Sequence, residues 1–249
     1  LAGVQVQLAG ALEEFWYLRG AFTEGRAHLE AVLASGAGFR SHRAEVHRSA
    51  GMLARYQGDL AAATGHLDAS LALFSEIVAE LRETESPHLA LFEHHVATTL
   101  SALSDVALLR GDTREAIGFA TDALALPTPA AGAAALLLGL AEHAAGDLGA
   151  ADQHFAQAQR LAEEAGDESL LASCLRNLGV VARDSGDLGA AETYYRRALS
   201  IDRRSAREQI LAHTLLSLAE LLAIKGGDPA DLLDEGLALA RALGDRQAE

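Results

Sequence analysis

The residues best able to bind a metal ion in this 249-residue chain are its ten histidines. Glu93, His94 and His95 are consecutive, so on a helix their side chains point about 100° apart and cannot bind one ion together. His42 and His47 are five positions apart and also diverge, and the helical zinc motif HExxH does not occur. The sequence therefore predicts no metal site, and nothing in it indicates a cofactor.

Nucleophilic catalysis is not indicated either. Cys174 is the single cysteine, which excludes an intrachain disulfide and a cysteine metal cluster. It lies one residue before an apolar position of a helical pattern, so we expect a buried and inert thiol. The hydrolase pattern GxSxG is absent. The segment Gly36-Ala37-Gly38 lacks the third glycine and the preceding strand of a phosphate-binding loop. The sequence thus predicts a protein that is not an enzyme.

The elements that carry these side chains repeat along the chain. Residues 138–158 and 178–198 align without a gap and share Gly-Asp-Leu-Gly-Ala-Ala near their centres. Weaker copies turn at Gly20, Gly58, Gly111 and the pair Gly226-Gly227. Turn glycines recurring at spacings of about 35–53 residues are typical of a solenoid of repeated units that pack on their neighbours.

Each unit is predicted to contain an apolar helix A, a Gly-Asp turn and a helix B. In the fifth unit helix A runs from about Leu170 to Asp184, with apolar residues at the spacing of one helix face. Gly186 ends it, because glycine accepts the left-handed conformation common at helix C-termini. Asp187 can then cap helix B by accepting from free backbone N–H groups. A small residue at Gly179 lets the two helices approach closely.

Composition supports an all-helical, soluble chain. About a fifth of the residues are alanine, which has the highest helix propensity, and only four are proline. The longest apolar stretch, residues 130–141, is far shorter than the roughly twenty residues that span a membrane. The net charge is −15 and Lys225 is the only lysine, so we expect no direct nucleic-acid binding. The lack of a recognisable signal peptide and the single cysteine favour the cytoplasm.

The repeat resembles the tetratricopeptide repeat, a helix–turn–helix unit with small residues at fixed places and a large residue late in helix B. The matching sets are Gly51/Ala63/Leu67, Ala116/Ala120/Ala123, Gly139/Ala151/Phe155/Ala158 and Gly179/Ala191/Tyr195/Ala198. The first unit departs by placing Gly25 where alanine is usual, and the last has Pro229 in the first turn of helix B. The resemblance implies a single right-handed superhelical solenoid of about six helix–turn–helix repeats. Its approximate units are 6–37, 44–83, 88–128, 132–165, 169–204 and 208–243.

A finer resemblance rests on residues 15–34 (FWYLRGAFTEGRAHLEAVLA), residues 50–74 (AGMLARYQGDLAAATGHLDASLALF) and the LGD or AGD spacers. These segments are similar to the tetratricopeptide sensor arrays of bacterial STAND ATPase transcriptional regulators, the LuxR-, AfsR- and MalT-like proteins. The resemblance implies a module that binds a peptide, a protein segment or a small inducer, within a parent protein that binds ATP and DNA elsewhere. Two alternatives stay open: a free-standing adaptor that scaffolds protein assembly, and an accessory domain of a signalling enzyme.

The resemblance also implies a concave groove, lined by the helix A positions three before, one after and four after the small residue. The corresponding candidate residues are Arg48, Met52, Arg55, Ser101, Asp105, Leu140, His143, Arg176, Val180, Arg183 and Glu220. Two units place arginines seven residues apart on one helix face, and a guanidinium can bind a carboxylate or phosphate bidentately. We expect Arg176 and Arg183 to be surface contacts for an anionic group. Alternatively, the arginines pair with neighbouring acids such as Asp184 or Glu45.

The longest spacing between turns, from Gly58 to Gly111, predicts two lengthened helices. The first extends through residues 71–83, and the second includes Pro87 in its first turn with Ser86 as its N-cap. Together they would project as an antiparallel pair. They are either extra turns without a function or the wall of a docking site.

The C-terminal segment predicts a chain cut from a longer protein. Residues 239–249 echo residues 160–170, and Gly244-Asp245 resembles the spacer that leads into a further repeat. The last helix B would then lack its next neighbour, which exposes its leucines and predicts self-association through this end or fraying of it. These leucines are Leu232, Leu233, Leu237 and Leu239.

Overall fold

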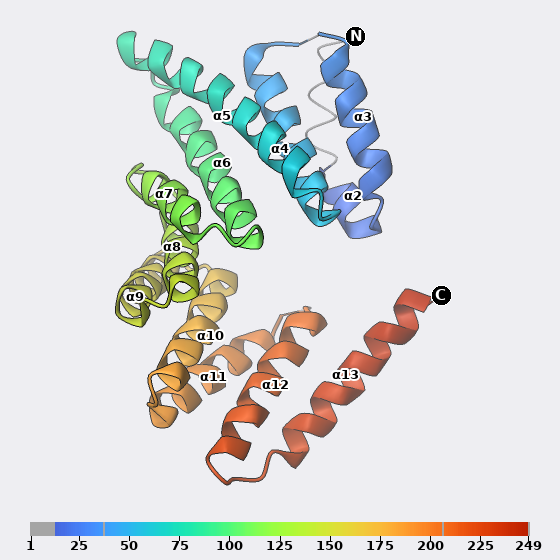
Figure 1. Cartoon of the computed structure of the whole chain (residues 1–249), viewed down its shortest axis with the longest axis vertical. Helices are drawn as coiled ribbons and strands as arrows, with labels where there is room; N and C mark the ends of the chain where they lie inside the picture. Colours follow the sequence, from blue (N-terminus) through green and yellow to red (C-terminus); the bar gives the residue numbers. More distant parts are fainter. Residues whose placement is uncertain (1–12, 37, 206, 249) are drawn as a thin grey trace. The chain divides into compact units, whose positions relative to one another are not determined.

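The computed structural model describes residues 13–36, 38–205 and 207–248. Within these ranges the chain forms twelve helices and no strand, so the predicted all-helical fold is confirmed (Figure 1). The helices are α2 (Glu13–Arg19), α3 (Phe22–Ala34), α4 (Arg40–Tyr56), α5 (Leu60–Glu83), α6 (Leu89–Leu109), α7 (Thr113–Leu124), α8 (Ala131–Ala145), α9 (Leu148–Ala165), α10 (Glu168–Asp184), α11 (Leu188–Asp202), α12 (Glu208–Ile224) and α13 (Ala230–Ala248). Two compact units divide the chain, residues 1–137 and residues 138–249, and the boundary falls within α8.

Four of the described turns between paired helices follow one chemical rule. A glycine with positive φ ends helix A, and the following aspartate caps helix B by accepting a hydrogen bond from the backbone N–H three residues later. In the turn between α10 and α11, Gly186 has φ +85° and Asp187 accepts from the Ala190 N–H at 2.9 Å. The same pairing occurs at Gly58-Asp59, Gly111-Asp112 and Gly146-Asp147. The predicted turn chemistry is thus confirmed at these four turns, whereas α3 begins after Ala21 without a side-chain cap.

Several helix pairs bring a glycine directly against a large side chain. A Cβ atom added to Gly179 would lie 2.6 Å from the Tyr195 ring, so α10 and α11 can approach only because this position is glycine. Gly139 faces Phe155 in the same way. In the first pair the arrangement is reversed, because Trp16 on α2 packs over Gly25 on α3. The unusual glycine of the first repeat is therefore explained by the tryptophan opposite it.

The unit of residues 1–137 is dominated by the long helices α5 and α6, which pack against each other and, through α5, against α4 (Figure 1). The predicted lengthening of both helices is confirmed. Their extended halves are not free, because Phe74, Ile77 and Phe92 pack against Ala44 of α4 in one apolar cluster. The expected start of the second helix is wrong: α6 begins at Leu89, and Pro87 precedes it.

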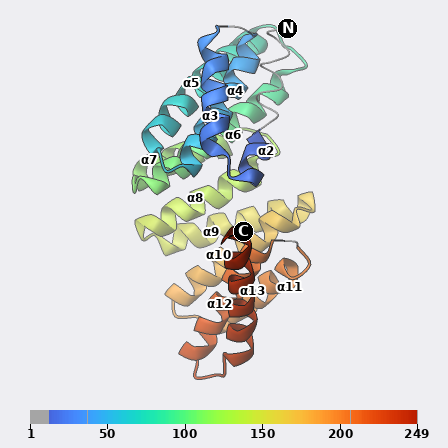
Figure 2. The ribbon, with the colours of Figure 1, turned by 90° about the vertical axis from the view of Figure 1, so that its right-hand side faces the viewer.

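The unit of residues 138–249 is built from neighbouring helices that follow one another along the chain (Figure 2). One apolar cluster joins Tyr195 and Leu199 of α11 to Leu215 and Leu218 of α12. Helix α13 starts at Ala230, so Pro229 lies before its first turn rather than within it, and α13 continues through Gly244 instead of ending there. Those two boundary expectations are therefore wrong.

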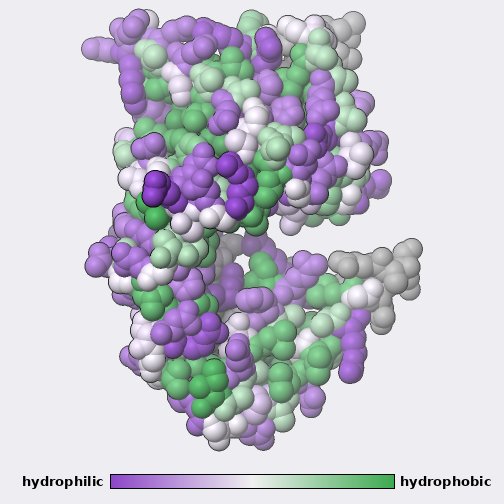
Figure 3. Space-filling view, in the orientation of Figure 1, coloured by the Kyte–Doolittle hydropathy of each residue, from purple (hydrophilic) through white to green (hydrophobic). Residues whose placement is uncertain are grey.

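The leucines of α13 divide into two groups. Leu232 and Leu239 are partly buried against the cluster around α12, the first helix of the same pair. Leu233 and Leu237 remain 36% and 46% exposed, and Figure 3 shows apolar surface over α12 and α13. The described helices include none that is both long and apolar enough to cross a membrane.

Candidate functional site: the inner face of the A helices

The helix A positions singled out from the sequence lie beside one another in the unit of residues 138–249. His143 of α8 contacts Asp184 of α10 at 2.9 Å between Nε2 and Oδ2. Arg183 contacts Asp184 at 3.0 Å and also reaches Glu220 of α12 at 3.6 Å. These four side chains form a line across three A helices, which we call the charged row.

The pKa values within the charged row reflect these contacts. Burial acts to raise the pKa of Asp184, but hydrogen bonds from His143 and Arg183 outweigh it and lower the pKa overall. Burial acts to lower the pKa of Arg183, and its contact with Asp184 reverses that effect. Both groups are therefore held in their charged forms, so the Arg183–Asp184 pair presents fixed charges near neutral pH.

Apolar side chains accompany the charged row. Leu140 and Val180 are half-buried on the same helices, and Leu216, four residues before Glu220 on α12, is 43% exposed. Beneath the row lies Tyr195, whose pKa is raised by burial and which also feels the charge of Arg183. The face therefore offers charged and apolar contacts together, which suits a ligand made of amino-acid side chains.

Arg176 does not lie in the charged row, although it is on the same helix as Arg183. Its guanidinium donates to both carboxylate oxygens of Asp202 on α11, at 2.9 and 3.1 Å. The Asp202 side chain is 5% exposed and accepts a further hydrogen bond from Thr214 at 2.7 Å. The expectation that Arg176 is a simple surface position is wrong, because it neutralises a buried carboxylate.

In the unit of residues 1–137 the predicted arginines also meet acids. Arg55 of α4 forms an ion pair with Asp105 of α6, and both positions were predicted for the groove. Arg48 lies 3.6 Å from Glu13 of α2. Met52 and Ser101 are half-buried on the same two A helices. The groove arginines of both units thus have acidic partners, which favours the pairing alternative for the free protein.

The repeat pattern in the sequence did not identify most of the acidic residues that complete these ion pairs. Asp202 and Glu13 lie outside the helix A positions that the repeat pattern selects, and Asp202 is 26 residues from Arg176. One signal was available for Asp202: an aspartate directly after Ile201, at the buried end of an amphipathic helix, needs a cationic partner.

Other candidate chemistry is absent from the described residues. They contain no group of three or more histidine, cysteine or acidic side chains arranged to hold a metal ion. Cys174 is fully buried, and burial raises the pKa of its thiol to about 12. The structure thus confirms the expectation that the Cys174 thiol is buried.

Residues 131–204 match the tetratricopeptide repeat family. This stretch covers α8, α9, α10 and α11, which carry the glycine–aromatic pairs described above. The family match and the helix-pair geometry together support a tetratricopeptide-repeat domain, the class of protein–protein interaction or binding module. No curated protein matches the chain.

Similar solved structures have the same kind of fold. BtubC (BKLC) from P. vanneervenii has a TM-score of 0.68 at 17% identity, covering 98% of this chain and 92% of that one. The apo form of RapI has a TM-score of 0.73 at 12% identity, covering 97% of this chain and 65% of that one. A Rap protein complexed with Competence and Sporulation Factor has a TM-score of 0.67 at 17% identity, covering 88% and 59%. At these identities the similarity establishes the fold alone.

Proposed function

We propose that this chain is a non-catalytic binding module that recognises a peptide or protein segment through the inner face of its A helices. The charged row carries the proposal, because it crosses three helices and an extended segment can contact all of them. The apolar side chains beside the row add contacts for a partner's apolar residues. The Rap complex supports the proposal, since a similar fold is there bound to a factor.

Arg183 is the residue through which we propose that an acidic partner group binds. Its pair with Glu220 is long at 3.6 Å, and the Glu220 side chain is 64% exposed. Such exposed pairs contribute about 0–1 kcal/mol, so a ligand carboxylate can replace Glu220 at little energetic cost. Glu220 then turns to solvent or to a basic group of the same ligand. The acidic partners thus hold the guanidinium in place without blocking it.

The role within a larger protein is the sensor domain of a bacterial transcriptional regulator in the cytoplasm, following the resemblance of residues 15–34 and 50–74. The parent reading frame tests this role. A nucleotide-binding domain encoded ahead of this chain agrees with the regulator, whereas a protein made only of repeats identifies a free-standing adaptor.

Selection of a displayed random-peptide library on the chain tests the binding face. The affinity of a selected peptide is then measured by fluorescence anisotropy for the wild type, for Arg183→Glu and for Arg197→Glu. Arg197 is the matched control, because it lies on helix α11 and makes an exposed pair with Glu163 at 3.4 Å. We expect Arg183→Glu to weaken binding at least about tenfold and Arg197→Glu to have little effect. Equal affinities for the two variants would place the binding face elsewhere.

A further inference from the structure

A second feature of the unit of residues 138–249 lies at the ends of its helices, away from the Gly-Asp turns. The start of α10, the end of α11 and the start of α12 enclose a cavity of about 220 Å³. Its polar lining includes Arg176, Arg204, Arg207, Glu168 and Asp202. Three guanidinium groups against two carboxylates give this lining a net positive charge, in a chain whose net charge is −15.

We propose that this cavity binds a phosphate-type oxyanion, either free phosphate or the phosphate group of a small ligand. The volume is below the range of about 300–1,000 Å³ that is usual for drug-sized ligands, so a small anion or one anionic group fits it. The proposal is independent of the peptide-binding face, because it uses a different set of side chains.

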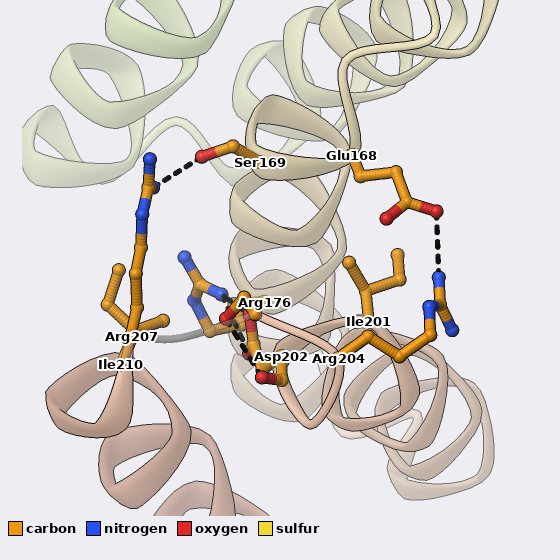
Figure 4. A pocket seen from close by; sticks show the side chains of 9 residues that line it. Glu168, Ser169, Arg176, Ile201, Asp202, Arg204, Arg207 and Ile210 are labelled. Atoms are coloured by element: carbon orange, nitrogen blue, oxygen red, sulfur yellow. Dashed lines mark hydrogen bonds and ion pairs between the residues drawn. The ribbon is translucent and has the colours of Figure 1, made fainter.

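Arg207 is the main binding residue of this site. It donates to the hydroxyl of Ser169, a neutral acceptor that does not cancel its positive charge (Figure 4). A guanidinium has five N–H donors, and the contact with Ser169 uses one of them. In Figure 4, Arg207 and Arg204 flank the cavity on opposite sides, one turned to Ser169 and the other to Glu168, and the Arg176–Asp202 pair lies between them. Guanidinium donors are thus available on both sides of the cavity.

The carboxylates of the lining do not close the site. Asp202 is covered by Arg176 and Thr214, so its charge is already neutralised. Glu168 pairs with Arg204 at 2.8 Å, but both side chains are more than half exposed, and such pairs are weak. An entering oxyanion can displace Glu168 into solvent and take its place on Arg204.

The start of α12 adds a further attraction. Helices α10 and α11 each have an aspartate cap, whereas α12 begins at Glu208 without a side-chain cap. Its first turn reaches the cavity through Ile210. The positive end of this 17-residue helix favours an anion, and Glu208 in its first turn already places one carboxylate there, so the arginines rather than the helix end carry the site.

Titration of the chain with inorganic phosphate at low ionic strength, by isothermal calorimetry, tests the proposal. We expect Arg207→Gln to weaken phosphate binding by at least about tenfold. The matched control is Arg203→Gln, which removes the same charge from a residue that pairs with Glu235 outside the cavity. The control should change the affinity by less than about twofold.

A variant that should strengthen phosphate binding provides a second test. Glu168→Gln removes the displaced carboxylate and releases Arg204, so it should tighten phosphate binding, and far-UV circular dichroism should show all three variants folded. The proposal is overturned if the wild type does not bind phosphate, or if Arg203→Gln weakens binding as much as Arg207→Gln. Weaker binding by a folded Glu168→Gln variant also overturns it. Acetate binding as tightly as phosphate would overturn the tetrahedral ligand class.

Discussion

The variant Gly179→Ala tests how tightly α10 packs against α11. A methyl group at this position would lie 2.6 Å from Tyr195 Cε1 and 2.8 Å from Cδ1, well inside normal contact distance. The ring has little room to move, because Tyr195 is 1% exposed. Adding such a group to a well-packed core typically costs about 1–3 kcal/mol of folding free energy.

The helix propensity of alanine opposes this cost, so a control is needed. Alanine favours a helix over glycine by about 1 kcal/mol. Gly189→Ala, on the neighbouring α11, gains a similar advantage, and its methyl group would meet only Asp187 Oδ1 at 3.5 Å, an ordinary contact. The difference between the two variants therefore isolates the steric term. We expect Gly179→Ala to be about 1–3 kcal/mol less stable than Gly189→Ala.

Urea denaturation followed by far-UV circular dichroism gives both free energies of unfolding. A second substitution, Tyr195→Leu, should recover part of the loss in the Gly179→Ala background, because the smaller side chain leaves room for the methyl group. Equal stability of the two alanine variants would refute the reasoning, since it would mean that the tyrosine ring yields freely.

Three further predictions concern the charged and buried groups. In urea denaturation, Arg176→Met should destabilise the protein by about 3–5 kcal/mol, because it leaves the buried Asp202 carboxylate without its cationic partner. Arg183→Met should cost under about 1 kcal/mol, because its ion pair with Glu220 is exposed. Similar losses for the two variants would contradict the different roles of the two arginines. Burial, together with nearby positive charges, lowers the pKa of His47 from 6.5 to about 4, so the unfolded chain binds this proton more tightly and stability should fall as pH decreases from about 6.5 to about 4. His47→Gln should flatten that part of the pH profile of stability. An unchanged slope would mean that other titratable groups cause the pH dependence. Cys174 should react with a thiol reagent far more slowly in the folded protein than in urea, and equal rates would contradict its burial.

The parts of the fold that sequence predicted best are those set by neighbouring residues. Gly186 and Asp187 end one helix and cap the next through bonds that span only a few positions, so their types and order are sufficient evidence. Gly179 and Tyr195 are predictable as a pair because the repeat recurs with the same spacing. Pro87 misled the prediction, because proline suits a first helical turn but does not require one.

The sequence predicts where the candidate site lies, but it does not predict which ion pairs its side chains form. The repeat spacing placed Arg183 and Glu220 on one face, where the structure joins them. It placed Arg176 there as well, but the conformation of that long side chain depends on Asp202, which only the packing of α11 against α10 brings near. Arg207 lies in a spacer, where no repeat position marks it, so its role depended on seeing the cavity.

The reversed pairing of Trp16 with Gly25 restricts how this array can have grown and how it can be re-engineered. At Gly51, Gly139 and Gly179 the glycine is on the first helix of a pair and the bulky side chain is on the second, as with Gly179 and Tyr195. A recombination event inside a pair that joined α2 to α11 would oppose tryptophan to tyrosine, and the reciprocal product would oppose glycine to glycine. The first product would have a steric clash at this helix contact, and the second would have a cavity there. Crossovers in the spacers between pairs avoid both outcomes, so the helix pair, rather than the single helix, is the transferable module of this chain.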